Sequence, residues 1–258
     1  MTNDTRRNVV YSSSHEAVIE DYPIPDIDAT PGFDDIFGRS RSYTMTSKEV
    51  MFSTYQAACY VAQRGIPGDI VECGVWRGGS ALLASLAVRA HDKPTPRRGW
   101  FARAAPKRRT WLYDTFEGMT APTDEDVDLT GVAASEYMGT YADDGRWCYA
   151  DEADVRGVFA SEGFADDDIR VVKGDVCETL RQTRPERIAL LRLDTDWYES
   201  TLAELELLYP RLSPGGVLII DDYGHWAGAR KAVDEFFERE PPLLLNRIGY
   251  AVRVAIKV

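Results

Sequence analysis

Short apolar runs alternate with helix-like segments along most of the chain. Two of these runs, Ile188–Leu193 and 217–220, flank a segment at 203–212 whose apolar residues recur with helical spacing. Apolar runs of four to eight residues bounded by turn signals are typical of buried parallel strands in a βαβ unit. Three further strands of the same kind are expected at 69–72, 111–113 and 169–172. The pattern therefore predicts an α/β fold built on a parallel sheet.

Weaker patterns complete this picture. Further helices are expected at 46–64, 151–161 and 229–239. Thr46 and Glu49 have the spacing of a capping box at the start of the first of these helices. Near the end of the chain, 243–245 and 250–256 alternate like an antiparallel hairpin. We therefore predict a seven-stranded, mostly parallel sheet with helices on both faces and a C-terminal antiparallel hairpin.

Two segments lack a clear period. Residues 1–43 are rich in Pro, Asp and Ser and are expected to form an N-terminal arm or lid, which leaves 44–258 as the main domain. A disordered tail is the alternative for residues 1–15. Residues 118–150 are acidic and are expected to form a mobile crossover loop near the carboxyl edge of the sheet. The basic segment 93–109 is expected to be either a solvated surface insertion or an interaction patch.

Acidic residues follow two of the expected strands directly. Asp194 and Asp196 come after the first run, and Asp221 and Asp222 come after the second. Because the carboxyl ends of parallel strands share one edge of the sheet, where ligands bind, these side chains should lie close together. Carboxylates that close together repel one another unless a cation lies between them. The sequence therefore predicts a divalent metal site at this edge.

A glycine-rich turn follows the first expected strand. It contains Glu72, Gly74, Gly78, Gly79 and Ser80. The spacing differs from the dinucleotide fingerprint, and no Walker lysine follows the glycines. An acidic residue at the strand end suits a cofactor that carries an ammonium group, such as S-adenosylmethionine (SAM). The alternative is an ordinary tight turn between a strand and a helix.

Three further residues are candidates for the same edge. Asp114 closes the next strand, where a carboxylate can reach a ribose diol, and Asp175 closes the one after, where it can reach an adenine amino group. Each could instead be an ordinary strand-end or helix-cap residue. His225 lies close to the acidic pair and is expected to be a base, a substrate contact or a capping or surface histidine.

Composition narrows the possible partners. The chain has 258 residues and a formal charge of −12, which argues against nucleic acid or an anionic membrane as its main partner. Its four cysteines are widely spaced, so neither a zinc site nor a disulfide framework is expected. The N-terminus lacks the apolar region of a secretory signal, and no apolar run is long enough to span a bilayer. We expect a cytoplasmic protein.

Four segments carry a resemblance to a known family. VECGVWRGGSA, LYDTFEGM, LRLDTDWYEST and GGVLIIDDYGHWAGARKAVDEFF resemble the macrocin-type O-methyltransferases, which methylate deoxysugar hydroxyls on macrolide and aminocoumarin antibiotics. The similarity covers 44–256. It implies a class I SAM-dependent methyltransferase fold that uses SAM and Mg²⁺, and it implies a homo-oligomer. The implied Mg²⁺ ligands are Asp194, Asp221 and Asp222. The implied SAM site is the 72–80 turn with Asp114 and Asp175.

The resemblance also implies a reaction. It identifies Asp194 as the general base of a methyl transfer to a sugar hydroxyl of a glycosylated secondary metabolite. A catechol-type methyltransferase that acts on a phenolic acceptor is the nearest alternative, because it shares the fold and the metal. A metal-dependent hydrolase and a non-catalytic metabolite-binding protein are weaker alternatives, since neither requires both the glycine-rich turn and the acidic cluster.

Overall fold

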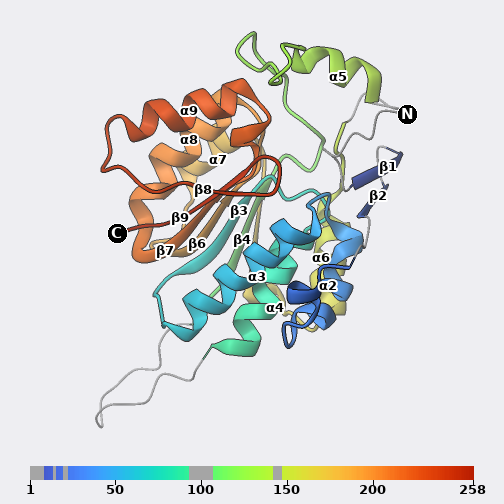
Figure 1. The fold of residues 1–258 in the computed structure, drawn as a ribbon, viewed down its shortest axis with the longest axis vertical. Helices are drawn as coiled ribbons and strands as arrows, with labels where there is room; N and C mark the ends of the chain where they lie inside the picture. The colour runs from blue at the N-terminus through green and yellow to red at the C-terminus, as the bar shows by residue number, and fades with distance from the viewer. Residues whose placement is uncertain (1–8, 14–15, 20–22, 93–106, 142–146) are drawn as a thin grey trace.

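The computed structural model describes residues 9–13, 16–19, 23–92, 107–141 and 147–258 (Figure 1). A seven-stranded sheet forms its centre, in the strand order β5-β4-β3-β6-β7-β9-β8. These strands are β3 (Asp69–Cys73), β4 (Thr110–Asp114), β5 (Ile169–Lys173), β6 (Ile188–Leu193), β7 (Leu212–Ile220), β8 (Asn246–Ile248) and β9 (Val252–Ile256). The first five are mutually parallel, and β9 runs antiparallel to both β7 and β8. The predicted sheet, with its antiparallel hairpin, is confirmed.

Helices cover both faces of the sheet (Figure 1). On one side lie α2 (Phe33–Ser40), α3 (Lys48–Gln63), α4 (Gly79–His91) and α6 (Glu152–Ser161), and on the other lie α7 (Val176–Gln182), α8 (Tyr198–Leu208) and α9 (Ala227–Phe237). Each face has its own apolar cluster, and successive strand residues alternate between them: Leu190 belongs to one cluster and Leu191 to the other. This double burial explains the continuous apolar run of β6.

The strand order locates the ligand edge. Strand β3 is followed in sequence by β4 on one side, whereas its neighbour on the other side is the later strand β6. The connections therefore leave in opposite directions at β3 and β6. Ligands of open α/β sheets bind at the carboxyl ends of the strands at such a switch point. The glycine-rich turn follows β3, and the first acidic residues follow β6.

The N-terminal region is more structured than its sequence pattern indicated. Strands β1 (Val9–Ser13) and β2 (Glu16–Ile19) pair with each other, and α1 (Pro25–Asp28), α2 and a 3-10 turn (Arg41–Tyr43) follow. Phe33 and Phe37 of α2 are almost fully buried in the main core. Residues 25–43 thus pack onto the domain, and a boundary at residue 43 stays an expectation.

Several local predictions need correction. Helix α3 begins at Lys48 with Ser47 as N-cap and no side-chain cap bond, so the expected Thr46–Glu49 capping box is absent; the hydroxyl of Thr46 instead accepts a hydrogen bond from Arg192. Residues 118–150 include a helix, α5 (Ala134–Tyr141), that the sequence analysis expected to be loop. The first strand of the C-terminal hairpin lies at β8, a few residues later than expected. Most of the basic segment 93–109 lies outside the described residues.

Membrane-spanning helices and cysteine pairing can be examined in the described part of the chain. Among the described residues, no helix combines the length and apolar character that a membrane crossing requires. All four cysteines are described, and each carries a free thiol. Two of these thiols, Cys59 and Cys73, are buried in the core.

Candidate active site

Two neighbouring parallel strands deliver acidic residues to one point of the sheet edge. The register pairs Leu193 of β6 with Ile220 of β7, and the backbone N–H of Asp221 donates to the carbonyl oxygen of Leu193. One carboxylate oxygen from each of Asp194, Asp221 and Asp222 lies within 4.8 Å of the other two. The structure thus brings the three carboxylates together, while metal binding itself stays a prediction.

Arg192 is a buried cation beneath this cluster. Its Nη1 lies 2.6 Å from Glu72 Oε1 and 2.5 Å from Asp194 Oδ2, and its Nη2 lies 2.5 Å from Asp221 Oδ1. The guanidinium therefore neutralises part of the acidic charge from below. Arg192 was not among the site residues predicted from the sequence. One signal was available in the sequence: Arg192 is a charged residue inside an otherwise apolar strand. A charged side chain is rarely buried unless it is paired.

The remaining oxygens of the cluster suit a hard cation. Arg192 occupies Oδ2 of Asp194 and Oδ1 of Asp221, which leaves one oxygen of each for another partner. Burial and neighbouring carboxylates hold the pKa values of Asp194 and Asp222 well above their ordinary range. A bound divalent cation would favour the charged forms instead. Carboxylate oxygens are the ligands that Mg²⁺ prefers, so these residues fit that ion.

Asp196 belongs to the edge of the cluster. It has a positive φ of 68° and is not one of the three residues whose carboxylate oxygens converge. The indole Nε1 of Trp226 donates to Asp196 Oδ1 at 2.8 Å. Burial raises the pKa of Asp196 to about 7. Asp196 therefore connects the acidic cluster to an aromatic group beside it.

The glycines of the turn after β3 are required by the protein's own packing. Gly74 has a φ of 78°, and a Cβ there would overlap the carbonyl oxygen of Asp194. A Cβ on Gly79 would lie 2.6 Å from the backbone of Tyr43, and one on Gly78 would touch side chains of α6 at 3.3 Å. The ordinary tight-turn alternative thus accounts for all three glycines. Close approach of a ligand to this backbone stays a prediction.

Two carboxylates hold the turn in place. Asp114 Oδ2 accepts from the backbone N–H groups of Val75 at 2.7 Å and Trp76 at 3.0 Å. Glu72 is buried, and its Oε1 accepts from the hydroxyl of Ser80 at 2.5 Å and from Arg192 at 2.6 Å. Its Oε2 has no hydrogen-bond partner among the described residues. Both residues lie where the sequence placed them, at the ends of adjacent strands.

The other two candidates have visible structural roles. Asp175 is the N-cap of α7, and its side chain accepts from the backbone N–H of Cys177 at 2.8 Å. His225 follows the 3-10 turn Asp222–Gly224; its ring centroid lies 4.6 Å from that of Trp226, and its Nδ1 lies 3.3 Å from the hydroxyl of Tyr250. Contacts of Asp175 with adenine and of His225 with the acceptor stay predictions.

Hydrogen bonds and isolated β-bridges hold the crossover segment 118–141 beside the same edge of the sheet. Asp126 is fully buried, and its Oδ1 accepts from the backbone N–H of Tyr198, the first residue of α8. Asp128 accepts from the hydroxyl of Tyr137 at 2.6 Å and from two backbone N–H groups of its own turn. Isolated bridges join Asp128 to Trp226 and Val127 to Ala133. The segment therefore has a defined position, where the sequence analysis expected a mobile loop.

An aromatic group lies between this segment and the acidic cluster. Its rings are those of Tyr137, Trp147, Trp197 and Trp226. Trp226 makes edge contacts with Trp197 at 5.2 Å and with Tyr137 at 5.5 Å. Trp226 also bonds Asp196, so the aromatic group continues directly into the carboxylates. Trp226 thus combines core packing with a polar connection to the cluster.

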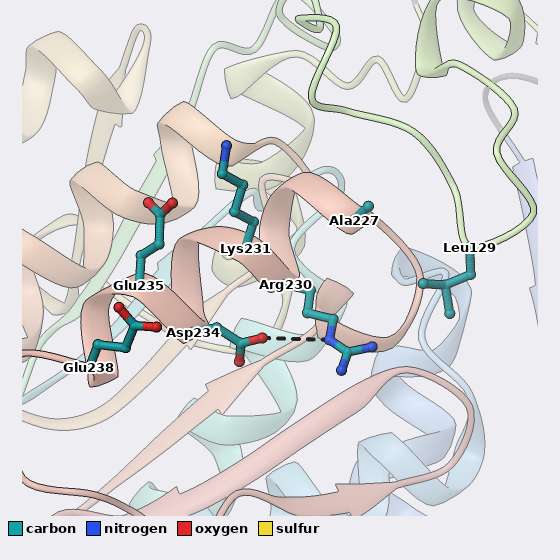
Figure 2. A pocket seen from close by; sticks show the side chains of 7 residues that line it. All are labelled: Leu129, Ala227, Arg230, Lys231, Asp234, Glu235 and Glu238. Atoms are coloured by element: carbon teal, nitrogen blue, oxygen red, sulfur yellow. Dashed lines mark ion pairs between the residues drawn. The ribbon is translucent and has the colours of Figure 1, made fainter.

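A separate groove lies on the outer surface of α9 (Figure 2). It is lined by Leu129, Ala227, Arg230, Lys231, Asp234, Glu235 and Glu238. Several of its charges are already paired, because Arg230 bonds Asp234 within the groove and Lys231 bonds Glu125 beside it. The groove contains none of the three converging carboxylates. We assign the chemistry to the sheet edge and not to this groove.

Comparison with known proteins identifies the family. A model of the macrocin O-methyltransferase (TylF) family matches residues 30–242. The chain belongs to the macrocin O-methyltransferase family. The match begins before α2, so this helix is included in the family region. Membership supports O-methyltransferase activity.

Individual members of the family agree with this assignment. The chain is 36% identical, over 76% of its length and 68% of the relative's, to the 8-demethyl-8-(2,3-dimethoxy-alpha-L-rhamnosyl)-tetracenomycin-C 4'-O-methyltransferase of Streptomyces olivaceus. It is 35% identical, over 68% of its length and 62% of the relative's, to the mycinamicin III 3''-O-methyltransferase of Micromonospora griseorubida. The solved structure of the O-methyltransferase NovP matches with a TM-score of 0.66 and 29% identity, over 87% of this chain and 88% of that one. The fold is that of a class I SAM-dependent methyltransferase.

Proposed function

We propose that this member of the macrocin O-methyltransferase family is a SAM- and Mg²⁺-dependent enzyme of antibiotic biosynthesis that methylates a sugar hydroxyl of a glycosylated small molecule. The observation that carries the proposal is the convergence of Asp194, Asp221 and Asp222 within 4.8 Å, beside the turn that follows β3. Relatives named for action on glycosylated antibiotics support the acceptor class.

The reaction that these residues would perform is an in-line displacement. A bound SAM would supply the methyl group: the acceptor oxygen would displace the sulfur, so that an O–C bond forms as the S–C bond breaks. Asp194 would accept the hydroxyl proton as the general base. A Mg²⁺ held by Asp194, Asp221 and Asp222 would polarise the hydroxyl and lower its pKa. The products are a methyl ether and S-adenosylhomocysteine (SAH).

The surrounding residues would orient the two substrates. Asp114, at the end of β4, would accept from the ribose hydroxyls, and Asp175, at the start of α7, would accept from the adenine amino group. His225 and the aromatic group around Trp226 would contact the acceptor. The segment 118–141 would cover the site and keep water from the sulfonium. Such a site requires neither nucleic acid nor a membrane.

A panel assay tests the proposal. Isotopically labelled SAM is incubated with the enzyme and glycosylated antibiotics, their aglycones and catechols, each with EDTA or with Mg²⁺. We expect label on glycosides alone, loss of transfer in EDTA and recovery with Mg²⁺. Transfer to catechols but not to glycosides would favour the phenolic alternative. Absence of SAH binding by calorimetry would contradict the proposal as a whole.

A further inference from the structure

Trp76 occupies the turn between β3 and α4 in a strained backbone conformation. Its φ is +45°, in the left-handed region that bulky residues rarely adopt. Such a conformation costs about 1–3 kcal/mol and persists only where the surroundings enforce it. Asp114 enforces it here, because one carboxylate oxygen accepts from the backbone N–H groups of both Val75 and Trp76. Strain of this kind is concentrated at functional sites.

The indole N–H of Trp76 is a buried donor with no hydrogen-bond partner among the described residues. Trp76 is only 8% exposed, and its Nε1 makes no hydrogen bond to any described residue. A buried unsatisfied donor costs about 1–3 kcal/mol. Other described side chains also contain a buried polar atom that makes no hydrogen bond. In each of them, as in Glu72 and Arg192, another polar atom of the same side chain is bonded. Trp76 has only this one polar atom in its side chain, so the indole as a whole lacks a hydrogen-bond partner in the described structure.

The position of the indole relates it to both halves of the site. It packs with Met45, Cys148 and Ala150, which come from the segment before α3 and from the end of the crossover. Burial raises the pKa of the Cys148 thiol, and the nearby charges of Asp194 and Asp114 add to that effect. The turn that carries Trp76 is bonded to Asp114, and its Gly74 packs against the backbone of Asp194, so it lies between the strand end proposed for the ribose and the metal cluster. The amino-acid end and the sulfonium of SAM would occupy this region.

The chemistry of SAM selects the acceptor for this donor. Asp114 and Asp194 are carboxylates, so they can accept from ribose or acceptor hydroxyls but repel another carboxylate. The amino-acid end of SAM carries one ammonium and one carboxylate. The unpartnered Glu72 Oε2 on the same turn is an acceptor, and the Trp76 indole is a donor. Hydrogen bonds to an ionised group are roughly twice as strong as neutral ones, so the carboxylate is the strongest available acceptor.

We propose that the indole N–H of Trp76 binds the α-carboxylate of SAM, and that Asp114 holds the strained turn that places it there. This inference rests on the proposed function, because it requires SAM as the ligand. It assigns Asp114 a second role as a positioning residue. It also explains why the turn contains a tryptophan where backbone geometry alone would favour glycine.

Indole NMR tests the proposal directly. The six tryptophans are labelled with 15N, and the Trp76 signal is identified with Trp76→Phe. We expect SAH to move this signal downfield. 5'-Methylthioadenosine, which keeps the adenosine and sulfur but lacks the amino acid, should leave it unmoved. If Trp76→Phe does not fold, replacing the other five tryptophans one at a time identifies the signal by elimination.

Calorimetry supplies a second readout with a matched control. Trp76→Phe should weaken SAH binding about tenfold and methylthioadenosine binding less than twofold, as expected for the loss of one charge-assisted hydrogen bond. Trp111→Phe, whose indole bonds Asp69 at the opposite end of the sheet, should change neither. An equal shift of the Trp76 signal with both ligands, or no shift when SAH binds, overturns the inference. Failure of SAH to bind the wild-type protein overturns the proposed function, and this inference with it.

Discussion

Arg192 and Glu72 form a buried ion pair across neighbouring strands. The register places Arg192 of β6 beside Glu72 of β3, and Nη1 lies 2.6 Å from Oε1. The two side chains are 3% and 2% exposed. Because the same guanidinium contacts Asp194 and Asp221, it joins the turn proposed for SAM to the acidic cluster. The fold thus carries its own cation beneath the proposed metal site.

Arg192→Met should destabilise the protein strongly. Removing one partner of a buried pair leaves an uncompensated charge and typically costs about 3–5 kcal/mol of unfolding free energy. Urea denaturation measures this loss. Added Mg²⁺ should recover part of it, because the ion would neutralise the acidic cluster from above.

The double variant Arg192→Met/Glu72→Gln is the matched control for this prediction. It removes both charges of the pair, so it should be more stable than Arg192→Met alone. If the changes in unfolding free energy of the two single variants sum to that of the double variant, the two residues are not coupled. A single variant as stable as wild type would contradict the importance of the pair.

Gly74→Ala should disrupt the protein more than an equivalent change elsewhere. Gly74 and Gly131 both have positive φ, at 78° and 88°. A Cβ on Gly74 would overlap the backbone of Asp194, whereas nothing lies within 4 Å of one on Gly131. We expect Gly131→Ala to cost about 1 kcal/mol, from the positive φ alone, and Gly74→Ala several times more. Equal melting temperatures for the two variants would contradict this packing argument.

Two kinds of feature could be predicted from the sequence: strands, from the pattern of apolar residues, and the grouping of carboxylates, from their positions at strand ends. The alternation of Leu190 and Leu191 between two faces requires the continuous apolar run that identified β6. Asp194 and Asp221 could be placed together because parallel strands share an edge. Such properties are local or follow from topology, and a single chain reveals them.

Features that depend on partners distant in sequence were not predictable. Arg192 pairs with Glu72, which lies 120 positions away, and bonds Thr46, which lies 146 positions away. The order of the crossover arises from Asp126, which bonds a residue 72 positions away. No periodicity encodes such contacts. Acidic, irregular sequence therefore suggested mobility where buried side-chain bonds impose a defined position.

Asp126→Ala should loosen the crossover segment 118–141 without changing the affinity for the cofactor. The change removes the acceptor for the backbone N–H of Tyr198 and for the N–H of Thr123, at a cost of about 2 kcal/mol. We expect faster hydrogen exchange across 119–137 and a several-fold higher KM for the acceptor, with SAH affinity within twofold of wild type. Asp124→Ala, at an exposed position of the same segment, is the control. An unchanged exchange pattern would count against a covering role for this segment.

Glu204→Gln should flatten the pH dependence of stability. Burial raises the pKa of Glu204 from 4.5 to about 8. The folded state therefore holds a proton that the unfolded state releases above pH 4.5, so this residue's contribution to stability falls as pH rises toward 8. The slope is on the order of 1.4 kcal/mol per pH unit. Urea titrations at several pH values should show the variant gaining relative to wild type over this range, and parallel curves would refute the assignment.

Asp221→Asn should remove activity while leaving the fold intact. Asparagine keeps the shape of the side chain and can still accept from Arg192, but it removes one negative ligand from the cluster. We expect a fall in turnover of about a hundredfold, or about 3 kcal/mol of transition-state stabilisation. SAH affinity should stay within twofold, because the residues proposed to bind the cofactor lie on other strands. Asp166→Asn, at an exposed position, should behave like wild type in both measurements.

Metal removal tests the same cluster without a mutation. EDTA should abolish turnover, and Mg²⁺ should restore it, while calorimetric binding of SAH persists throughout. Titration of the apoprotein with Mg²⁺ should give a binding isotherm that Asp221→Asn weakens and Asp166→Asn preserves. This readout is independent of the acceptor, so it remains available before the sugar is identified. Full turnover in exhaustively chelated enzyme would refute the metal assignment of Asp194, Asp221 and Asp222, and would leave Arg192 as the cation of the site.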